Sequence, residues 1–255
     1  MRNYSKNDRR GGIYFLDGKP YVSVTKVLEI IDKPALKYWH GEEIYHALVA
    51  NPSLSKEEAM AAPYQKTKDA QNRGITVHSV VESYKQTGKV IESIPEQFKG
   101  YTEAFYRWIE DHPSYQIVEN EKTVVNKKFH YAGTLDMLIK VEGKNYIVDI
   151  KTNKDGNIYD EAFLQTSAYQ YALREMGIGC DGMFILALSE TGKYTYREAD
   201  DRMVSFLAAL YLWYGKNKSL CQRLNYNVPN VEKLFTNTLQ TTESSVQENA
   251  LPLIG

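Results

Sequence analysis

Residues 129–151 of the chain read FHYAGTLDMLIKVEGKNYIVDIK. Apolar side chains alternate from Phe129 to Asp136, and the apolar character continues to Val141, where a Glu-Gly-Lys-Asn turn cluster follows. The next run, Tyr146–Lys151, is rich in β-branched residues and almost continuously apolar, which is typical of a central strand. We therefore predict two adjacent strands joined by a tight turn.

Both predicted strands carry charges where a central strand is normally apolar. Asp149 and Lys151 stand two positions apart, so their side chains share one face of a strand, which Asp136 on the neighbouring strand can reach. Two close carboxylates repel each other unless a cation lies between them, and oxygen ligands suit Mg²⁺ or Mn²⁺. Such an ion activates water and neutralises charge on a phosphoryl group, while a nearby lysine binds phosphate as a point charge. We therefore predict a metal site that hydrolyses a phosphodiester.

Two helical segments supply further candidate residues. After the polar loop 152–160 an apolar helical stripe begins, and Gln165 and Tyr169 lie beside it at i and i+4. This pair is predicted to hold a nucleic-acid strand or to orient Lys151, although tyrosine at helical spacing is also common in a core. Upstream, His78 lies on a partly apolar helix, where it is either a site residue or a structural one.

Four short motifs now stand in a definite order: Gly74-x-x-x-His78, Gly133-x-x-Asp136, Asp149-x-Lys151-Thr152 and Gln165-x-x-x-Tyr169. In this order they resemble the PD-(D/E)XK nuclease superfamily, and within it the RecB-like exonuclease branch that includes the mitochondrial genome maintenance exonuclease and its phage and bacterial relatives. The segment Ser23–Leu28 and Trp39 match a further stretch near the start of that branch. The likeness extends over residues 22–213. Leu135 departs from the proline of the superfamily name, and Asp149 replaces the commoner glutamate.

The resemblance implies Mg²⁺-dependent or Mn²⁺-dependent cleavage of DNA. It places His78, Asp136 and Asp149 around the metal together with the backbone carbonyl of Ile150, and it gives Lys151 the role of assisting the attacking water. We also expect Thr152, Gln165 and Tyr169 to bind the substrate. Relatives with an iron–sulfur cluster need four cysteines, and this chain has two, Cys180 and Cys221, so we expect no such cluster.

Composition narrows the class of protein. The chain has 43% hydrophobic and 25% charged residues, no run of membrane-spanning length and a polar amino terminus, so we expect a cytoplasmic protein of a bacterium or a phage-infected cell. Its net charge of −1 does not indicate nucleic-acid binding, but a local basic lining can still bind phosphate. Of the basic residues, we place Arg73, Lys127 and Lys154 near the DNA strand; the other candidates are Arg2, Lys6, Arg9, Arg10, Lys66, Lys68 and Lys128.

The expected organisation is one nuclease domain, residues 1–227, with an α/β core of the restriction-endonuclease type: a mixed sheet flanked by helices. It comprises an amino-terminal arm and hairpin (1–21), a mainly helical part (22–113) and the catalytic sheet with its helices (114–227). Residues 228–255 are polar and aperiodic and are predicted to be a disordered tail. The apolar end of that tail, residues 251–255, is either a partner-docking peptide or a frayed terminus.

Local signals complete the prediction. Asp17-Gly18 indicates a hairpin turn, and Ser55 with Glu58 forms a capping-box pattern that opens a helix. Pro63 is expected to divide that helix from the helix that carries His78.

We therefore expect a DNA exonuclease that prefers single-stranded or end-processed DNA and acts in replication, recombination, repair or phage DNA metabolism. An endonuclease of the same fold, acting on flaps or junctions, remains open. A non-catalytic DNA-binding subunit is disfavoured, because such a protein has no chemical need for Asp136, Asp149 and Lys151 together.

Overall fold

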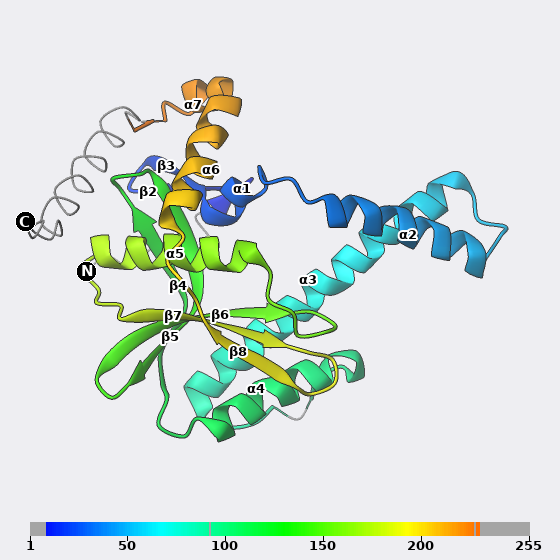
Figure 1. Cartoon of the computed structure of the whole chain (residues 1–255), viewed down its shortest axis with the longest axis horizontal. Helices are drawn as coiled ribbons and strands as arrows, with labels where there is room; N and C mark the ends of the chain where they lie inside the picture. Colours follow the sequence, from blue (N-terminus) through cyan, green and yellow to red (C-terminus); the bar gives the residue numbers. More distant parts are fainter. Residues whose placement is uncertain (1–8, 92, 227, 230–255) are drawn as a thin grey trace, which may run out of the picture.

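The computed structural model describes residues 9–91, 93–226 and 228–229. Within them, one mixed sheet of eight strands is flanked by helices on both faces (Figure 1), which confirms the predicted α/β class. The strand order is β1-β2-β3-β5-β6-β7-β8, and β4 pairs with β5 beside this path. The strands are β1 (Arg9–Arg10), β2 (Ile13–Leu16), β3 (Lys19–Ser23), β4 (Gln116–Asn126), β5 (Tyr131–Val141), β6 (Lys144–Thr152), β7 (Gly182–Leu188) and β8 (Tyr194–Glu198).

The helices are α1 (Val24–Leu28), α2 (Pro34–Ala50), α3 (Lys56–Thr87), the 3-10 turn η2 (Glu96–Phe98), α4 (Lys99–Asp111), α5 (Asp160–Glu175), α6 (Met203–Lys216) and α7 (Lys218–Arg223). None of the helices in the described ranges is long and apolar enough to cross a membrane.

The amino-terminal hairpin forms where the sequence predicts it. Its two turn residues, Asp17 and Gly18, have φ values of 51° and 72°, and a two-residue hairpin turn of this type needs positive φ at both positions. The hairpin joins the main sheet because β3 pairs in parallel with the first residues of β5.

Successive side chains of a strand point to opposite faces of the sheet and pack in two hydrophobic layers. Ile147 of β6 packs in the layer under α1, α5 and α6, whereas Val148, its neighbour, packs in the layer under α3 and α4. Figure 1 shows these helices on opposite faces of the sheet. Phe105 and Trp108 of α4 are fully buried in the second layer.

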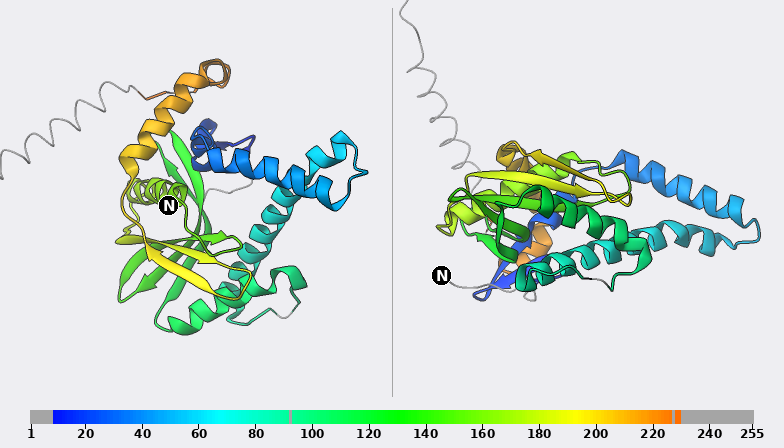
Figure 2. Two further views of the ribbon diagram at one scale, coloured as in Figure 1. Left: turned by 45° about the vertical axis from the view of Figure 1, so that its right-hand side comes forward. Right: turned by 90° about the horizontal axis from the view of Figure 1, so that it is seen from below.

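A helical arm projects from this body. The arm consists of α2 and the first half of α3, which pack against each other and extend away from the sheet (Figures 1 and 2). No residue of α2 is buried, and large side chains of the arm face solvent, among them Tyr38, Tyr45 and Tyr64.

The prediction that Pro63 ends a helix is wrong. α3 runs without a break from Lys56 to Thr87, and it begins at the predicted capping box of Ser55 and Glu58. Proline removes only one backbone hydrogen bond, and the buried Pro63 lies in the part of α3 that packs on α2. Thr67 Oγ1 donates to the Pro63 carbonyl, 2.9 Å away. Tertiary packing therefore keeps a helix that sequence alone would interrupt.

Candidate active site

The site is built where β6 separates from β5. β4 pairs with β5 along one edge. On the other edge, residues 137–141 of β5 pair with β6 and residues 131–132 pair with β3, and the described structure has no strand pairing on that edge between them. The N–H of Ile150 thus lacks a partner on β5 and donates to Asp136 Oδ2, 2.7 Å away. The Asp136 carboxylate caps the departing strand with one oxygen, which fixes the position of the other.

Three potential metal ligands meet at this point from three elements. His78 comes from α3, Glu121 from β4 and Asp136 from β5, and their ligand atoms all lie within 4.8 Å of one another. His78 Nδ1 is 2.8 Å from Glu121 Oε1 and 3.9 Å from Asp136 Oδ1. Each side chain is only partly buried, so the cluster is open to an ion and a substrate.

A second chain of contacts runs from β6 to α5. Lys151 Nζ lies 2.7 Å from Asp149 Oδ2 and donates to Gln165 Oε1 at 3.1 Å, and Gln165 Nε2 donates to the hydroxyl of Tyr169 at 3.0 Å. Tyr169 is buried, so it acts on the site through Gln165. The Gln165–Tyr169 pair thereby holds the ammonium of Lys151 in one place.

Position 133 of the Gly133-x-x-Asp136 motif has no room for a side chain. A Cβ at Gly133 would lie 2.4 Å from Cε1 of Tyr169, well inside van der Waals contact. The ring of Tyr169 occupies that space and thereby presents its hydroxyl to Gln165. Two motifs that lie far apart in the sequence are therefore parts of one packing arrangement.

The cluster shifts the proton affinity of its members. Burial alone would lower the pKa of His78, but the negative charge of Asp136 and the hydrogen bond with Glu121 outweigh it and raise the pKa to about 9. Burial also raises the pKa of Asp149 to about 6, which the nearby Lys151 offsets only in part.

For Lys151, burial opposes the charged form, but Asp149 and Asp136 outweigh it and raise its pKa. Burial wins for Asp149 but not for Lys151, because Lys151 faces the two carboxylates of Asp149 and Asp136, whereas Asp136 repels the charge of Asp149. The lysine is therefore an ammonium at neutral pH.

The residues of the site fit a divalent cation. One imidazole and two carboxylates converge, and both oxygens of the fully buried Asp149 lack a hydrogen-bond donor of normal geometry within the described residues. Buried carboxylate oxygens without donors are costly unless a cation compensates them. Oxygen-rich donor sets suit Mg²⁺ and Mn²⁺, and the imidazole is a better ligand for Mn²⁺.

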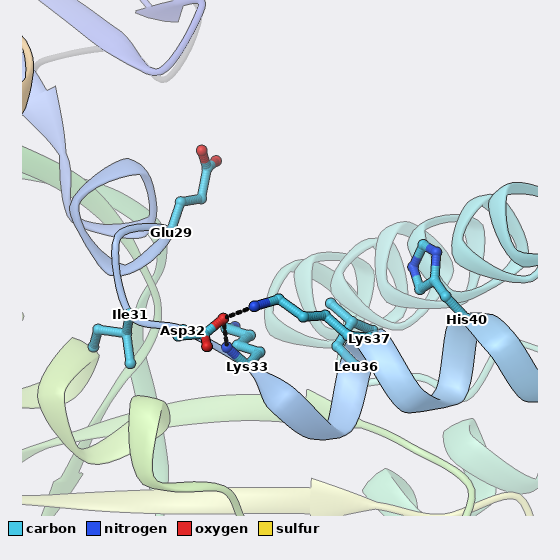
Figure 3. Close-up of a pocket in the computed structure, with 7 residues that line it drawn as sticks. All are labelled: Glu29, Ile31, Asp32, Lys33, Leu36, Lys37 and His40. Atoms are coloured by element: carbon cyan, nitrogen blue, oxygen red, sulfur yellow. Dashed lines mark hydrogen bonds and ion pairs between the residues drawn. The ribbon is translucent and has the colours of Figure 1, made fainter.

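Two pockets extend from the site towards the arm. One, of about 320 Å³, is lined by the predicted residues Lys151, Thr152 and Gln165. It shares Glu29 and Lys33 with a larger pocket, of about 570 Å³, on the base of α2. In Figure 3 the Lys37 ammonium pairs with Asp32, 2.5 Å away, at the wall of that second pocket. The hollow thus leads from Lys151 to the exposed arm.

The three basic residues predicted to line the DNA path lie in different surroundings. Arg73 is partly buried: its Nη2 donates to the backbone carbonyl of Thr152, and its guanidinium stacks on Tyr101 at 4.9 Å. Lys154 is exposed on the loop after β6. Lys127 lies in the turn before β5, where its N–H donates to Glu175 Oε1. Asn126, the residue before Lys127, pairs with Tyr131 of β5, which lies five residues, or about 17 Å, before Asp136 along the strand. Lys127 therefore lies away from the cluster.

Sequence reasoning missed Glu121 and Lys33. Glu121 belongs to no motif, and only the pairing of β4 with β5 brings it to Asp136. Lys33 precedes the helix-starting Pro34, a signal of a helix start but not of a pocket.

Comparison with known proteins identifies the class of fold and site. The model of the PD-(D/E)XK nuclease superfamily matches residues 94–241 of this 255-residue chain, and the chain belongs to that superfamily. The restriction-endonuclease-like architecture expected from the sequence is thereby confirmed. The RecB-like branch with the mitochondrial exonuclease stays a prediction.

No curated protein matches the chain. Among solved structures, an alkaline exonuclease from Laribacter hongkongensis is similar with 12% identity and a TM-score of 0.42, over 80% of this chain and 91% of that one. A putative exonuclease from Eubacterium rectale has 16% identity and a TM-score of 0.44, over 80% of each chain. Similarity at this level does not extend to activity or substrate.

Proposed function

We propose that this protein is a divalent-metal-dependent DNA exonuclease that hydrolyses phosphodiester bonds. One observation carries the proposal: in a member of a nuclease superfamily, His78, Glu121 and Asp136 converge within 4.8 Å, beside the Asp149–Lys151 pair. Carboxylates, an imidazole and a positioned ammonium are the groups that metal-assisted phosphodiester hydrolysis needs.

The metal would be held by His78, Asp136, Asp149 and the backbone carbonyl of Ile150. A bound divalent ion supplies a water of lowered pKa and neutralises charge on the phosphoryl oxygens. Lys151 is an ammonium and therefore donates to the phosphoryl oxygen or to the attacking water rather than accepting a proton. Gln165 holds this ammonium by accepting one of its hydrogen bonds, and Asp149 pairs with it at 2.7 Å, which leaves one of its three N–H groups for the substrate.

The surface towards the arm supports single-stranded or end-processed DNA as the substrate. Thr152 lies in the wall of the pocket beside Lys151, and Lys33 lies where this pocket meets the one at the base of α2. The exposed tyrosines of the arm offer aromatic faces on which unpaired bases stack. A duplex does not present unpaired bases. Such an activity fits DNA replication, recombination, repair or phage DNA metabolism. A cytoplasmic location also stays a prediction. Residues 230–255, which include the apolar end of the predicted tail, lie outside the described residues.

The test is a nuclease assay on labelled linear single-stranded, linear double-stranded and circular single-stranded DNA. We expect linear DNA to be degraded from its ends with Mg²⁺ or Mn²⁺ and to stay intact in chelator. Lys151→Ala should abolish the reaction, whereas Lys140→Ala, an exposed lysine on β5, should leave it unchanged.

Each alternative has its own outcome in this assay. Cleavage of circular single-stranded DNA would identify an endonuclease, because a circle has no end. DNA binding without cleavage of any substrate would identify a non-catalytic subunit. Equal activity of the Lys151→Ala variant would refute the assignment of the site.

A further inference from the structure

Glu121 has a backbone conformation that its strand does not require. Its φ is 49°, in the left-handed region that costs a non-glycine residue about 1–3 kcal/mol. The other described non-glycine residues with positive φ, namely Asp17, His130, Glu142 and Asn225, all lie in turns, whereas Glu121 lies in the middle of β4. Strain of this kind persists where the surroundings hold a side chain in a particular place.

That place is directly opposite another carboxylate. Asn120 pairs with Met137 and Lys122 with Leu135, so Glu121 stands across from Asp136 on the adjacent strand. Like charges opposite each other destabilise a sheet, and His78 of α3 pairs with both of these carboxylates. The fold therefore holds Glu121, Asp136 and His78 together, with their ligand atoms within 4.8 Å of one another.

We propose that Glu121 is itself a ligand of the catalytic cation, which it binds together with His78 and Asp136. This inference rests on the proposed function, but it places the ion between α3, β4 and β5 and adds a ligand that none of the four sequence motifs contains. The consequence is a site with three carboxylates, counting the nearby Asp149, and one imidazole.

The geometry distinguishes a ligand from a residue that merely orients His78. A carboxylate that only orients a metal-bound histidine bonds to the ring nitrogen that faces away from the metal. Here Nδ1 faces Glu121 at 2.8 Å and Asp136 at 3.9 Å, so a single nitrogen points at both carboxylates. An ion bound to that nitrogen and to Asp136 lies against the Glu121 carboxylate as well.

The experiment measures Mn²⁺ binding to the full-length protein without DNA, by the loss of the free Mn²⁺ signal in electron paramagnetic resonance. Glu121→Gln keeps the size of the side chain and an acceptor for Nδ1–H but removes the charge. We expect it to weaken Mn²⁺ binding at least about tenfold. The matched control is Glu119→Gln on the same strand, whose carboxylate contacts Lys85 and Lys122 and should not matter for the ion.

A second measurement on the same samples separates the two roles. At saturating Mn²⁺, electron spin echo modulation from a histidine nitrogen should persist in Glu121→Gln, because His78 remains bound. Disappearance of that modulation would assign Glu121 to positioning of His78 and overturn the inference. Unfolding in chelator should show that Glu121→Gln still unfolds cooperatively, so that a loss of Mn²⁺ binding is not a loss of the fold.

The outcomes for the inference and for the proposed function differ. Equal Mn²⁺ affinities of the wild type and Glu121→Gln, or equal losses in Glu121→Gln and Glu119→Gln, would refute Glu121 as a ligand while leaving the enzyme metal-dependent. Absence of Mn²⁺ and Mg²⁺ binding to the wild type would instead refute the proposed function.

Discussion

Replacement of Asp149 by asparagine should make the metal-free protein more stable, even though it should abolish activity. Asp149 is fully buried, and burial raises its pKa from the ordinary 3.8 to about 6. Each pKa unit corresponds to about 1.4 kcal/mol, so the ionised carboxylate costs the fold about 3 kcal/mol, with the partial compensation by Lys151 already included. Asparagine keeps the shape and removes the charge, and the expected gain is therefore up to about 3 kcal/mol.

The pH dependence follows from the direction of the shift. A raised pKa in the folded state means that the fold favours the protonated acid, so the penalty is small below pH 3.8 and grows as the pH rises towards 6. Above about pH 6 the penalty is complete. The advantage of Asp149→Asn should accordingly be small at pH 4 and largest at pH 7–8.

The assay is urea unfolding followed by tryptophan fluorescence, in chelator at pH 4 and pH 8 and again at pH 8 with excess Mn²⁺. Cation binding stabilises the wild type by about 2.7 kcal/mol at a hundredfold excess over Kd, so the gap should close or reverse there. Asp155→Asn, an exposed neighbour, serves as the control and should show no such pH dependence. A variant that is less stable than the wild type at pH 8 in chelator would refute the reasoning.

Three further predictions follow from the same contacts. Gly133→Ala places a Cβ 2.4 Å from the ring of Tyr169, so it should cost about 1–3 kcal/mol in chemical denaturation and slow DNA cleavage; an unchanged rate would show that the ring does not position Lys151. Protonated His78 stabilises the metal-free fold below pH 6.5, and this contribution is lost as the pH rises through about 9. Mn²⁺ binding at pH 7.5 should therefore release about one proton, seen by calorimetry in buffers of different ionisation enthalpy. Arg73→Lys loses the fork that stacks on Tyr101 and bonds the backbone of β6, so stability should fall by about 1–2 kcal/mol; weaker DNA binding at unchanged stability would instead support a direct contact with the strand.

The sheet and the motif residues could be predicted because their signals are local. The strand pair β5 and β6 forms at the apolar runs around the Glu-Gly-Lys-Asn turn, and the Asp17-Gly18 turn follows from two residues that tolerate positive φ. Asp136, Asp149 and Lys151 could be singled out because a charge on an otherwise apolar strand needs a partner.

Pro63 shows where local reasoning stops. Its effect on a helix is worth a few kcal/mol, yet α3 continues through it where the helix packs on α2. The helix propensity of a single residue predicts helix ends only weakly, because tertiary contacts add up over many residues and override it.

The amino-acid sequence by itself determined the class of fold and the residue types of the proposed metal site, because each depends on periodicity or on a short motif. Only the tertiary structure decided which groups meet. The register between β4 and β5 sets Glu121 against Asp136, and the ring of Tyr169 fills the space that Gly133 leaves. These contacts join residues from different strands and helices, and no local pattern encodes the distance between them.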